Sequence, residues 1–182
     1  MNKTLRNLLV FFAVPLVVLV DQVTKWMVLT EPRFNALDCL ASLEPCGRIP
    51  LPGVMDLSMV WNRGMSWGML QSEGIMRWVL VLVSVVIALG FSVWLWRAGR
   101  WLTGTGLALV VGGAIGNVID RVRFGAVVDF FDFQEIWPPY FFNYVFNVAD
   151  AAITVGAALL FFDQFILSGD DKDEAKVASP NP

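Results

Sequence analysis

Four apolar runs in this sequence are each long enough to cross a lipid bilayer, and they limit the possible folds more than any other feature. A helix needs about 20 mainly apolar residues to span the hydrocarbon core. We expect such helices at residues 8–29, 75–96, 101–119 and 147–167. The whole chain is 57% hydrophobic, which is too apolar for a soluble domain of this length. The sequence therefore predicts an all-α membrane protein whose four transmembrane helices form a single domain, residues 1–168.

The first run begins like a secretory signal peptide. Lys3 and Arg6 precede the apolar residues, as the basic residues of a signal peptide do. No small-residue cleavage site follows, and the run continues past Asp21 to Leu29. We therefore expect a retained first transmembrane helix that bends at Pro15.

The connecting segments predict structure outside the bilayer. Residues 30–74 are rich in Pro and Gly and too long for a simple connection, and β-favouring residues lie at 54–61. We expect a small extracytoplasmic β-containing element there. Residues 122–146 form a second extracytoplasmic segment, whose aromatic side chains suit the membrane interface. The acidic end, residues 169–182, has the composition of a disordered cytoplasmic tail.

Basic residues in the short loops predict the orientation. Lys3, Arg6, Arg97 and Arg100 place the N-terminus and the turn between the second and third helices in the cytoplasm. Four spans then place both termini there. Because successive spans alternate in direction, the end of the first helix, the end of the third and the start of the fourth meet at the outer face. We expect the functional groups at that face.

The acids near these helix ends differ in their neighbours. Asp129 and Asp150 are flanked only by apolar residues, whereas Asp120 adjoins Arg121 and Asp21 precedes Lys25 by one helical turn. Two desolvated carboxylates can share one proton and act as general acid and general base. Histidine is absent from the chain, which removes the histidine-dependent triads and zinc sites. We expect chemistry by an aspartic dyad, with no metal ion or cofactor, and structural ion pairs for the other acids.

Simpler interpretations of the two acids stay open at this stage. Asn147 has the position of an N-cap, so Asp150 is explained equally by the positive end of the fourth helix. Asp129 is explained equally by a turn in an exposed loop. We interpret Asp132 and Asp163 as solvated acids at the membrane interfaces. The glycines of 112–116 indicate close helix packing.

Four sequence blocks follow one another along the chain: DQVTK (21–25), GGAIGNVIDR (112–121), VVDFFDF (127–133) and FNVAD (146–150). Together they resemble the lipoprotein signal peptidase family, the aspartic signal peptidases II of bacterial membranes. They match the family in type, order and spacing over nearly the whole chain. A fifth block departs from the family: the pattern N-x-G-x-A-F is NRGMSW here, so that Ser66 and Trp67 alter the expected shape of the pocket.

The resemblance implies a membrane endopeptidase of the bacterial inner membrane. Its implied substrates are prolipoproteins whose cysteine carries a diacylglyceryl group, cut just before that cysteine. Membrane lipid and the cyclic peptide inhibitor globomycin are implied partners, and nucleic acid is not. Asp129 and Asp150 are the implied catalytic pair. The implied substrate-binding or site-supporting residues are Asn62, Asn117, Arg121, Asn147, Asp120, Asp21 and Lys25.

Two other functions are compatible with acids in a membrane protein. A small proton-coupled transporter also uses intramembrane acids with Asn and Arg partners, but such folds show internal repeats and broken helices near the midplane, which this sequence lacks. A non-catalytic scaffold leaves Asp129 unexplained. We also expect Cys39 and Cys46, in the long first loop, to form a disulfide.

Overall fold

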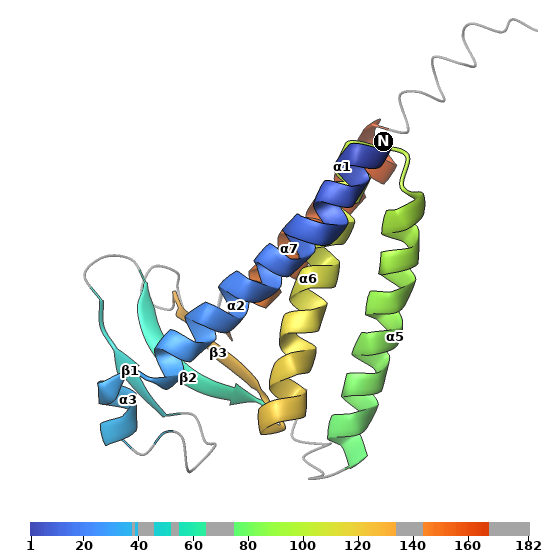
Figure 1. The fold of residues 1–182 in the computed structure, drawn as a ribbon. Coiled ribbons are helices and arrows are strands. Elements are labelled where there is room, and N and C mark those ends of the chain that lie inside the picture. The colour runs from blue at the N-terminus through green and yellow to red at the C-terminus, as the bar shows by residue number, and fades with distance from the viewer. Residues whose placement is uncertain (38, 40–45, 52–54, 65–74, 134–143, 168–182) are drawn as a thin grey trace, which may run out of the picture.

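The computed structural model describes residues 1–37, 39, 46–51, 55–64, 75–133 and 144–167. Within these residues, four helices are long and apolar enough to cross a membrane, which confirms the predicted number. A small antiparallel sheet packs at one end of the helices (Figure 1). The aromatic residues 137–142, Ser66, Trp67 and the acidic tail lie outside the described part of the chain. The four helices span Lys3–Leu29, Arg77–Arg97, Trp101–Phe124 and Val148–Phe165.

The first span has a short irregular stretch in front of its proline. Helix α1 (Lys3–Leu8) starts at an Asn2 cap, leads into a π-helical stretch (Leu9–Ala13), and continues as α2 (Val14–Leu29). Pro15 lacks the N–H that an α-helix needs, and its ring crowds the preceding turn. The wider π-helical turn directly before it accommodates this local defect.

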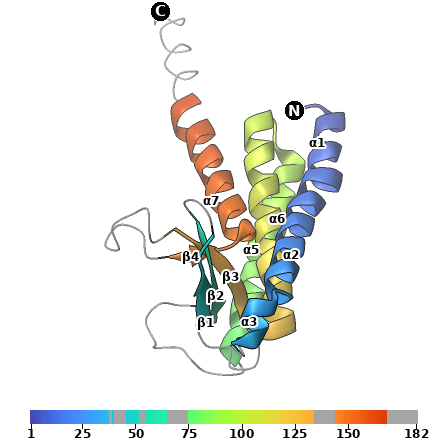
Figure 2. The same cartoon turned by 90° about the vertical axis from the view of Figure 1, so that its left-hand side faces the viewer.

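Helix α6 (Trp101–Phe124) is the centre of the bundle. It packs against α2, α5 (Ile75–Arg97) and α7 (Val148–Phe161), and most of its length is buried. Figure 2 shows α7 and α2 on either side of it. The last helix ends in a second π-helical stretch, Phe162–Leu167. The other spans expose mainly apolar side chains outwards, as lipid-facing helices do.

Glycines allow the helices to approach closely. A Cβ atom added to Gly106 would lie 2.8 Å from the carbonyl oxygen of Gly156, and one added to Gly156 would lie 2.6 Å from that of Gly106. A Cβ on Gly112 would lie 2.7 Å from the Cβ of Val17. Any larger residue at these positions would separate α6 from its neighbours, in agreement with the interpretation of the glycine-rich sequence as a packing surface.

The sheet has the order β1 (Cys46–Ile49), β2 (Asp56–Asn62), β3 (Val127–Asp132) and β4 (Val145–Phe146), with all neighbours antiparallel. β2 overlaps the β-favouring segment predicted from the sequence. β3 was not predicted, because the near-continuous apolar run around its acids has no clear alternation. One face of the sheet packs with the short helix α3 (Pro32–Ala36) in an apolar core. This core includes Phe34, Met59, Trp61, Val128 and Phe130.

The third span is longer than the sequence predicted. α6 continues to Phe124 instead of ending near residue 119, and Gly125 terminates it with φ 84°. The Gly125 N–H donates to the Arg121 carbonyl at 3.1 Å, which is a glycine C-cap. The chain then enters β3 after a short turn. This tight exit places Asp129 beside the last turns of α6.

Two acids that we expected to be solvated are buried. Asp163 is fully buried near the end of the last span, where Arg100 Nε lies 3.0 Å from its Oδ1 and the Thr103 hydroxyl donates to its Oδ2. Asp132 is 3% exposed, and the Ser58 hydroxyl donates to its Oδ2 at 2.6 Å. Their exposure was therefore predicted wrongly, because partners from other elements satisfy both carboxylates. Cys39 is buried and disulfide-bonded, whereas the side chain of Cys46, its expected partner, lies outside the described part.

Candidate active site

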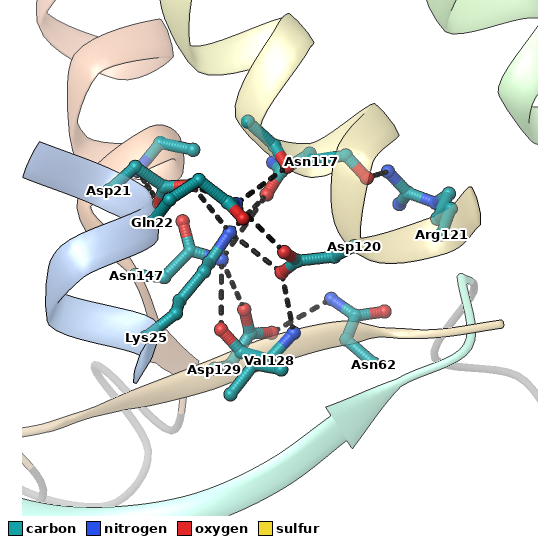
Figure 3. A network of polar contacts seen from close by, with 12 residues as sticks. Asp21, Gln22, Lys25, Asn62, Asn117, Asp120, Arg121, Val128, Asp129 and Asn147 are labelled. Carbon is teal, nitrogen blue, oxygen red and sulfur yellow. Dashed lines mark hydrogen bonds and ion pairs between the residues drawn. The ribbon is translucent and has the colours of Figure 1, made fainter. Parts of the chain in front are cut away.

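Four elements meet where the helix bundle joins the sheet, and each supplies polar side chains to one cluster (Figure 3). They are the C-terminal half of α2, the last turns of α6, strand β3 and the first turn of α7. β2 adds a residue from its end. The alternation of the spans predicts this meeting of helix ends, and the hydrogen bonds between these elements establish it.

Asp129 lies in the middle of β3 and is 2% exposed. Its two carboxyl oxygens accept two amide donors: Asn147 Nδ2 lies 2.6 Å from Oδ1, and Asn62 Nδ2 lies 3.0 Å from Oδ2. Asn62 reaches it because β2 and β3 are paired, with Asn62 opposite Val127. The interpretation of Asp129 as a turn residue in an exposed loop is therefore wrong.

Asp150 lies in the first turn of α7. Its backbone N–H donates to Oδ1 of the N-cap residue Asn147 at 2.9 Å, and its Oδ1 accepts Asn117 Nδ2 at 2.8 Å. The capping interpretation is thus confirmed for this turn. It leaves the Asp150 carboxylate available, because the cap uses only the backbone of Asp150. The Asn147 side chain therefore contacts both acidic residues. Its Nδ2 donates to the Asp129 carboxyl group, and its Oδ1 accepts the backbone N–H of Asp150.

The electrostatics of the two acids are coupled. Burial and, to a smaller extent, the negative charge of Asp150 together raise the pKa of the Asp129 carboxyl to about 7. The amide donors of Asn62 and Asn147 act in the opposite direction but are weaker. Arg121 lies near enough for its positive charge to attract both carboxylates. The Asp129 carboxyl therefore titrates close to neutral pH, which suits the proton-carrying member of an aspartic dyad.

A buried lysine lies behind the two acids. Lys25 Nζ is 2.8 Å from Asp21 Oδ2, 2.8 Å from Asp120 Oδ2 and 3.2 Å from Asn117 Oδ1. The Asp21–Lys25 pair predicted from the sequence is confirmed. The expected pairing of Asp120 with the adjacent Arg121 is corrected, since Asp120 pairs with Lys25 instead. Neighbouring residues of a helix point in different directions, so a basic residue from another helix is the better partner.

Sequence reasoning missed Gln22. Its Nε2 donates to Asp120 Oδ1 at 2.9 Å, and the same atom lies 3.2 Å from Asp21 Oδ2 and 3.3 Å from the Gly116 carbonyl oxygen. Gln22 thus satisfies Asp120 Oδ1, which Lys25 does not reach, and shares Asp21 Oδ2 with Lys25. Its position next to Asp21 was the only available signal, and an amide at the edge of a polar helix face is too common to single out.

The sequence as a whole identifies the class of protein. The sequence profile of the family described as Signal peptidase (SPase) II matches residues 13–166. The chain belongs to the signal peptidase II family. It is 41% identical over 150 residues to a lipoprotein signal peptidase of Caulobacter vibrioides, covering 82% of each chain. It is 43% identical over 158 residues to that of Sphingopyxis alaskensis, covering 86% of this chain and 83% of the relative.

A solved bacterial membrane enzyme, obtained by the in meso method at 2.3 Å resolution, has the same fold. It superposes with a TM-score of 0.65 at 25% identity and covers 85% of each chain. A second such structure, at 1.9 Å resolution, gives a TM-score of 0.68 at 23% identity, covering 86% of this chain and 92% of the other. Membership of the signal peptidase II family and the four apolar spans together make this chain a multi-pass membrane peptidase.

Proposed function

We propose that this signal peptidase II family member is an aspartic endopeptidase that removes the signal peptide from diacylglyceryl-modified prolipoproteins. The cut falls just before the lipidated cysteine. The observation that supports this best is the pair of Asp129 and Asp150, whose coupled charges and amide donors suit an acid–base dyad. A proton-coupled transporter is less well supported, because the polar cluster gathers where the bundle joins the sheet and not along a path through the helices.

In the proposed mechanism each acid has one role. Asp129 carries the proton, because burial and the charge of Asp150 raise its pKa to about 7 and so leave a protonated fraction at neutral pH, and it donates a hydrogen bond to the scissile carbonyl. Asp150 accepts a proton from water as the water oxygen attacks that carbonyl carbon. The tetrahedral intermediate collapses when the C–N bond breaks, and Asp150 returns the proton to the leaving nitrogen. No metal ion or cofactor takes part in this scheme.

Arg121 and the asparagines are proposed to support this chemistry. Arg121 Nε is buried and, within the described residues, lacks a hydrogen-bond partner, while its Nη1 lies 3.4 Å from the Asn117 carbonyl oxygen. This donor near both carboxylates suits a substrate carbonyl. Asn117 and Asn147 hold the acids in place through their amide groups. Asn62, from the end of β2, is exposed enough to meet an extended peptide as well.

The proposed orientation puts the dyad at the outer face of the bacterial inner membrane and both termini in the cytoplasm. The N-terminal ammonium donates to the Gly99 carbonyl and Arg6 Nη1 lies 3.3 Å from the Trp96 carbonyl oxygen, so the basic N-terminus and the basic α5–α6 turn share one end of the bundle. The sheet lies at the opposite end (Figure 1). This distribution fits a cytoplasmic basic end.

Membrane lipid is the proposed surrounding of the helices, and a lipidated substrate reaches the site from it. Globomycin, a cyclic peptide, is proposed to compete for the same peptide-binding position. Large apolar side chains are exposed along the first two spans, where they would face acyl chains. They include Phe11, Leu16, Trp26, Leu82, Val86 and Leu89.

The experiment compares cleavage of a lipid-modified precursor by the purified full-length protein and its variants. Asp129→Asn and Asp150→Asn should each abolish cleavage while the protein remains inserted and folded, because each removes half of the acid–base pair. Asp163→Asn is the matched control, since it removes a buried carboxylate at the other end of the bundle and should retain most of the activity. Mass spectrometry of the products locates the cut. Substantial cleavage by either dyad variant would exclude the proposed mechanism.

A further inference from the structure

The residue before each acid of the proposed dyad is held by another carboxylate. The Val128 N–H donates to Asp120 Oδ2 at 3.1 Å, and the Ala149 N–H donates to Asp21 Oδ1 at 2.9 Å. Val128 directly precedes Asp129, and Ala149 directly precedes Asp150. Each contact therefore fixes the main chain one residue from a reacting group. These two acceptors come from different helices, α6 and α2.

One lysine joins the two acceptors. Lys25 Nζ lies 2.8 Å from Oδ2 of Asp120 and 2.8 Å from Oδ2 of Asp21, and its side chain is 2% exposed. All three side chains are shielded from water, so competing solvent contacts do not loosen the ion pairs. Figure 3 shows Lys25 reaching between the two helices towards Asp120. A continuous chain of contacts therefore runs from β3 through Lys25 to α7.

We infer that Lys25 is a positioning residue that sets the separation of Asp129 and Asp150. The inference rests on the proposed function, because it assumes that these two acids form the dyad. Bridging by Nζ fixes Asp120 relative to Asp21, and the two backbone N–H contacts transmit this spacing to the strand and the helix that carry the acids. The third contact of Nζ, with Asn117 Oδ1, orients the amide that donates to Asp150.

The competing explanation is charge compensation alone. Two buried carboxylates need a nearby cation whatever else it does, and loss of Lys25 would destabilise the fold for that reason. The single variant Lys25→Met cannot separate the two explanations. A pair of double variants can separate them. In the wild type, Asp21, Lys25 and Asp120 together carry one net negative charge. A double variant that replaces Lys25 and neutralises one of the two acids keeps the same charge on the other acid.

The test uses Lys25→Met combined with Asp21→Asn, and separately Lys25→Met combined with Asp120→Asn. Each double variant keeps the wild-type net charge of the cluster. Each also keeps a side-chain oxygen to accept the Val128 and Ala149 N–H groups, since asparagine retains Oδ1. The ammonium bridge is lost, together with the contact of Nζ with Asn117 Oδ1. Thermal melting, kcat and KM are measured for both in detergent with the lipid-modified precursor, beside Lys25→Met.

The bridge predicts that the double variants regain melting behaviour close to wild type, whereas kcat stays lower by about 100-fold, as expected when reacting groups shift by roughly 1 Å. KM should change little, because the Lys25 side chain is only 2% exposed and so out of reach of a substrate. If the double variants recovered both the melting temperature and the kcat of the wild type, Lys25 would serve only to compensate charge, and the proposal would be overturned. Failure of both double variants to fold would also overturn it, by making the bridge a requirement for folding. Asp129→Asn in the same assay tests the dyad separately: cleavage by that variant would refute the proposed function, whatever the double variants do.

Discussion

Asn147 donates from Nδ2 to Oδ1 of Asp129 across 2.6 Å, and its own Oδ1 accepts the backbone N–H of Asp150 at 2.9 Å. One buried amide therefore links the strand acid to the helix acid. The capping bond fixes the start of α7, and the amide donor stabilises the ionised form of Asp129. We propose that this position combines a structural role with a functional one, and suitable substitutions can separate the two.

We predict that Asn147→Ala lowers the stability by about 1 kcal/mol through loss of the cap. It should also lower kcat roughly 10- to 100-fold, because the Asp129 carboxyl loses a buried hydrogen bond that holds it in place. Asn147→Ser is the matched variant, since serine retains a capping oxygen but has no amide to donate to Asp129. Thermal melting and cleavage kinetics check both. If Asn147→Ser restored cleavage activity as well as stability, the proposed role of the Asn147 amide as a donor to Asp129 would be contradicted.

The pH dependence of cleavage follows from the state of Asp129. Because burial raises its pKa to about 7, Asp129 keeps its proton below that pH and loses it above. A dyad that needs one proton then loses kcat/KM above about pH 7, by about tenfold per pH unit at the limit. The profile measured between about pH 5 and pH 9 should show this decline, and a flat profile across neutral pH would contradict it.

Asn62 tests the sign of this dependence. Its amide donates to Asp129 Oδ2 at 3.0 Å and favours the ionised carboxylate, so it lowers the pKa of Asp129. Asn62→Ala removes that effect and should move the alkaline decline of kcat/KM to higher pH. A shift to lower pH, or none, would show that the bond does not act on the titrating group. Asn62→Ser offers a partial control, because its hydroxyl can still donate over a shorter reach.

Much of the fold follows from hydropathy, because a lipid-spanning segment must be both helical and apolar along its length. The four spans were predictable on that basis, and the β-containing element was predictable from the β-favouring residues at 54–61. Strand β3 was not. Its acids and phenylalanines suggest an interfacial segment, and only pairing with β2 gives Asp129 its buried environment. Strands buried on both faces lack the alternation by which a strand is recognised.

The candidate site was predictable where sequence neighbours decide the outcome. Asp21 and Lys25 are one helical turn apart and do pair. Asp120 instead pairs with Lys25 across two helices, and Asp163 with Arg100. Such long-range partners depend on how the helices are rotated against each other. Close packing at the glycines determines that rotation, and the neighbours of a residue in the sequence do not reveal it. The carboxylate contacts with the Val128 and Ala149 N–H groups are beyond sequence reasoning for the same reason.

Asp120 and Arg121 are adjacent but should respond differently to substitution. Asp120 is fully buried and pairs with Lys25, so Asp120→Ala should cost on the order of 3 kcal/mol of stability by leaving Lys25 with one acid. Arg121 is half-buried near the dyad, so Arg121→Met should lower kcat/KM with a smaller effect on melting. Urea unfolding and cleavage kinetics distinguish them. Equal losses of stability in the two variants would contradict this division.

The last prediction concerns Arg77, which ties the start of α5 to the end of α6. Arg77 Nε donates to the Arg121 carbonyl at 2.6 Å, and its Nη2 donates to the Val122 carbonyl. These carbonyls belong to the last turn of α6, where the helix dipole favours a cation; the Arg121 carbonyl also accepts the capping Gly125 N–H. Arg77→Met should therefore lower the free energy of unfolding by about 2 kcal/mol, the usual range for hydrogen bonds from a charged group.

The exit from α6 into β3 passes this contact, because Gly125 packs against the Arg77 side chain. A loosened exit displaces Asp129, so Arg77→Met should also reduce kcat while the affinity for the precursor is retained. Arg77→Lys keeps the charge and at most part of the bonding, and should fall between Met and wild type. Arg97→Met, an exposed arginine at the other end of α5, is the control for losing a basic residue from this helix. Unchanged melting and kinetics in Arg77→Met would show that the α6 terminus holds its position without this arginine.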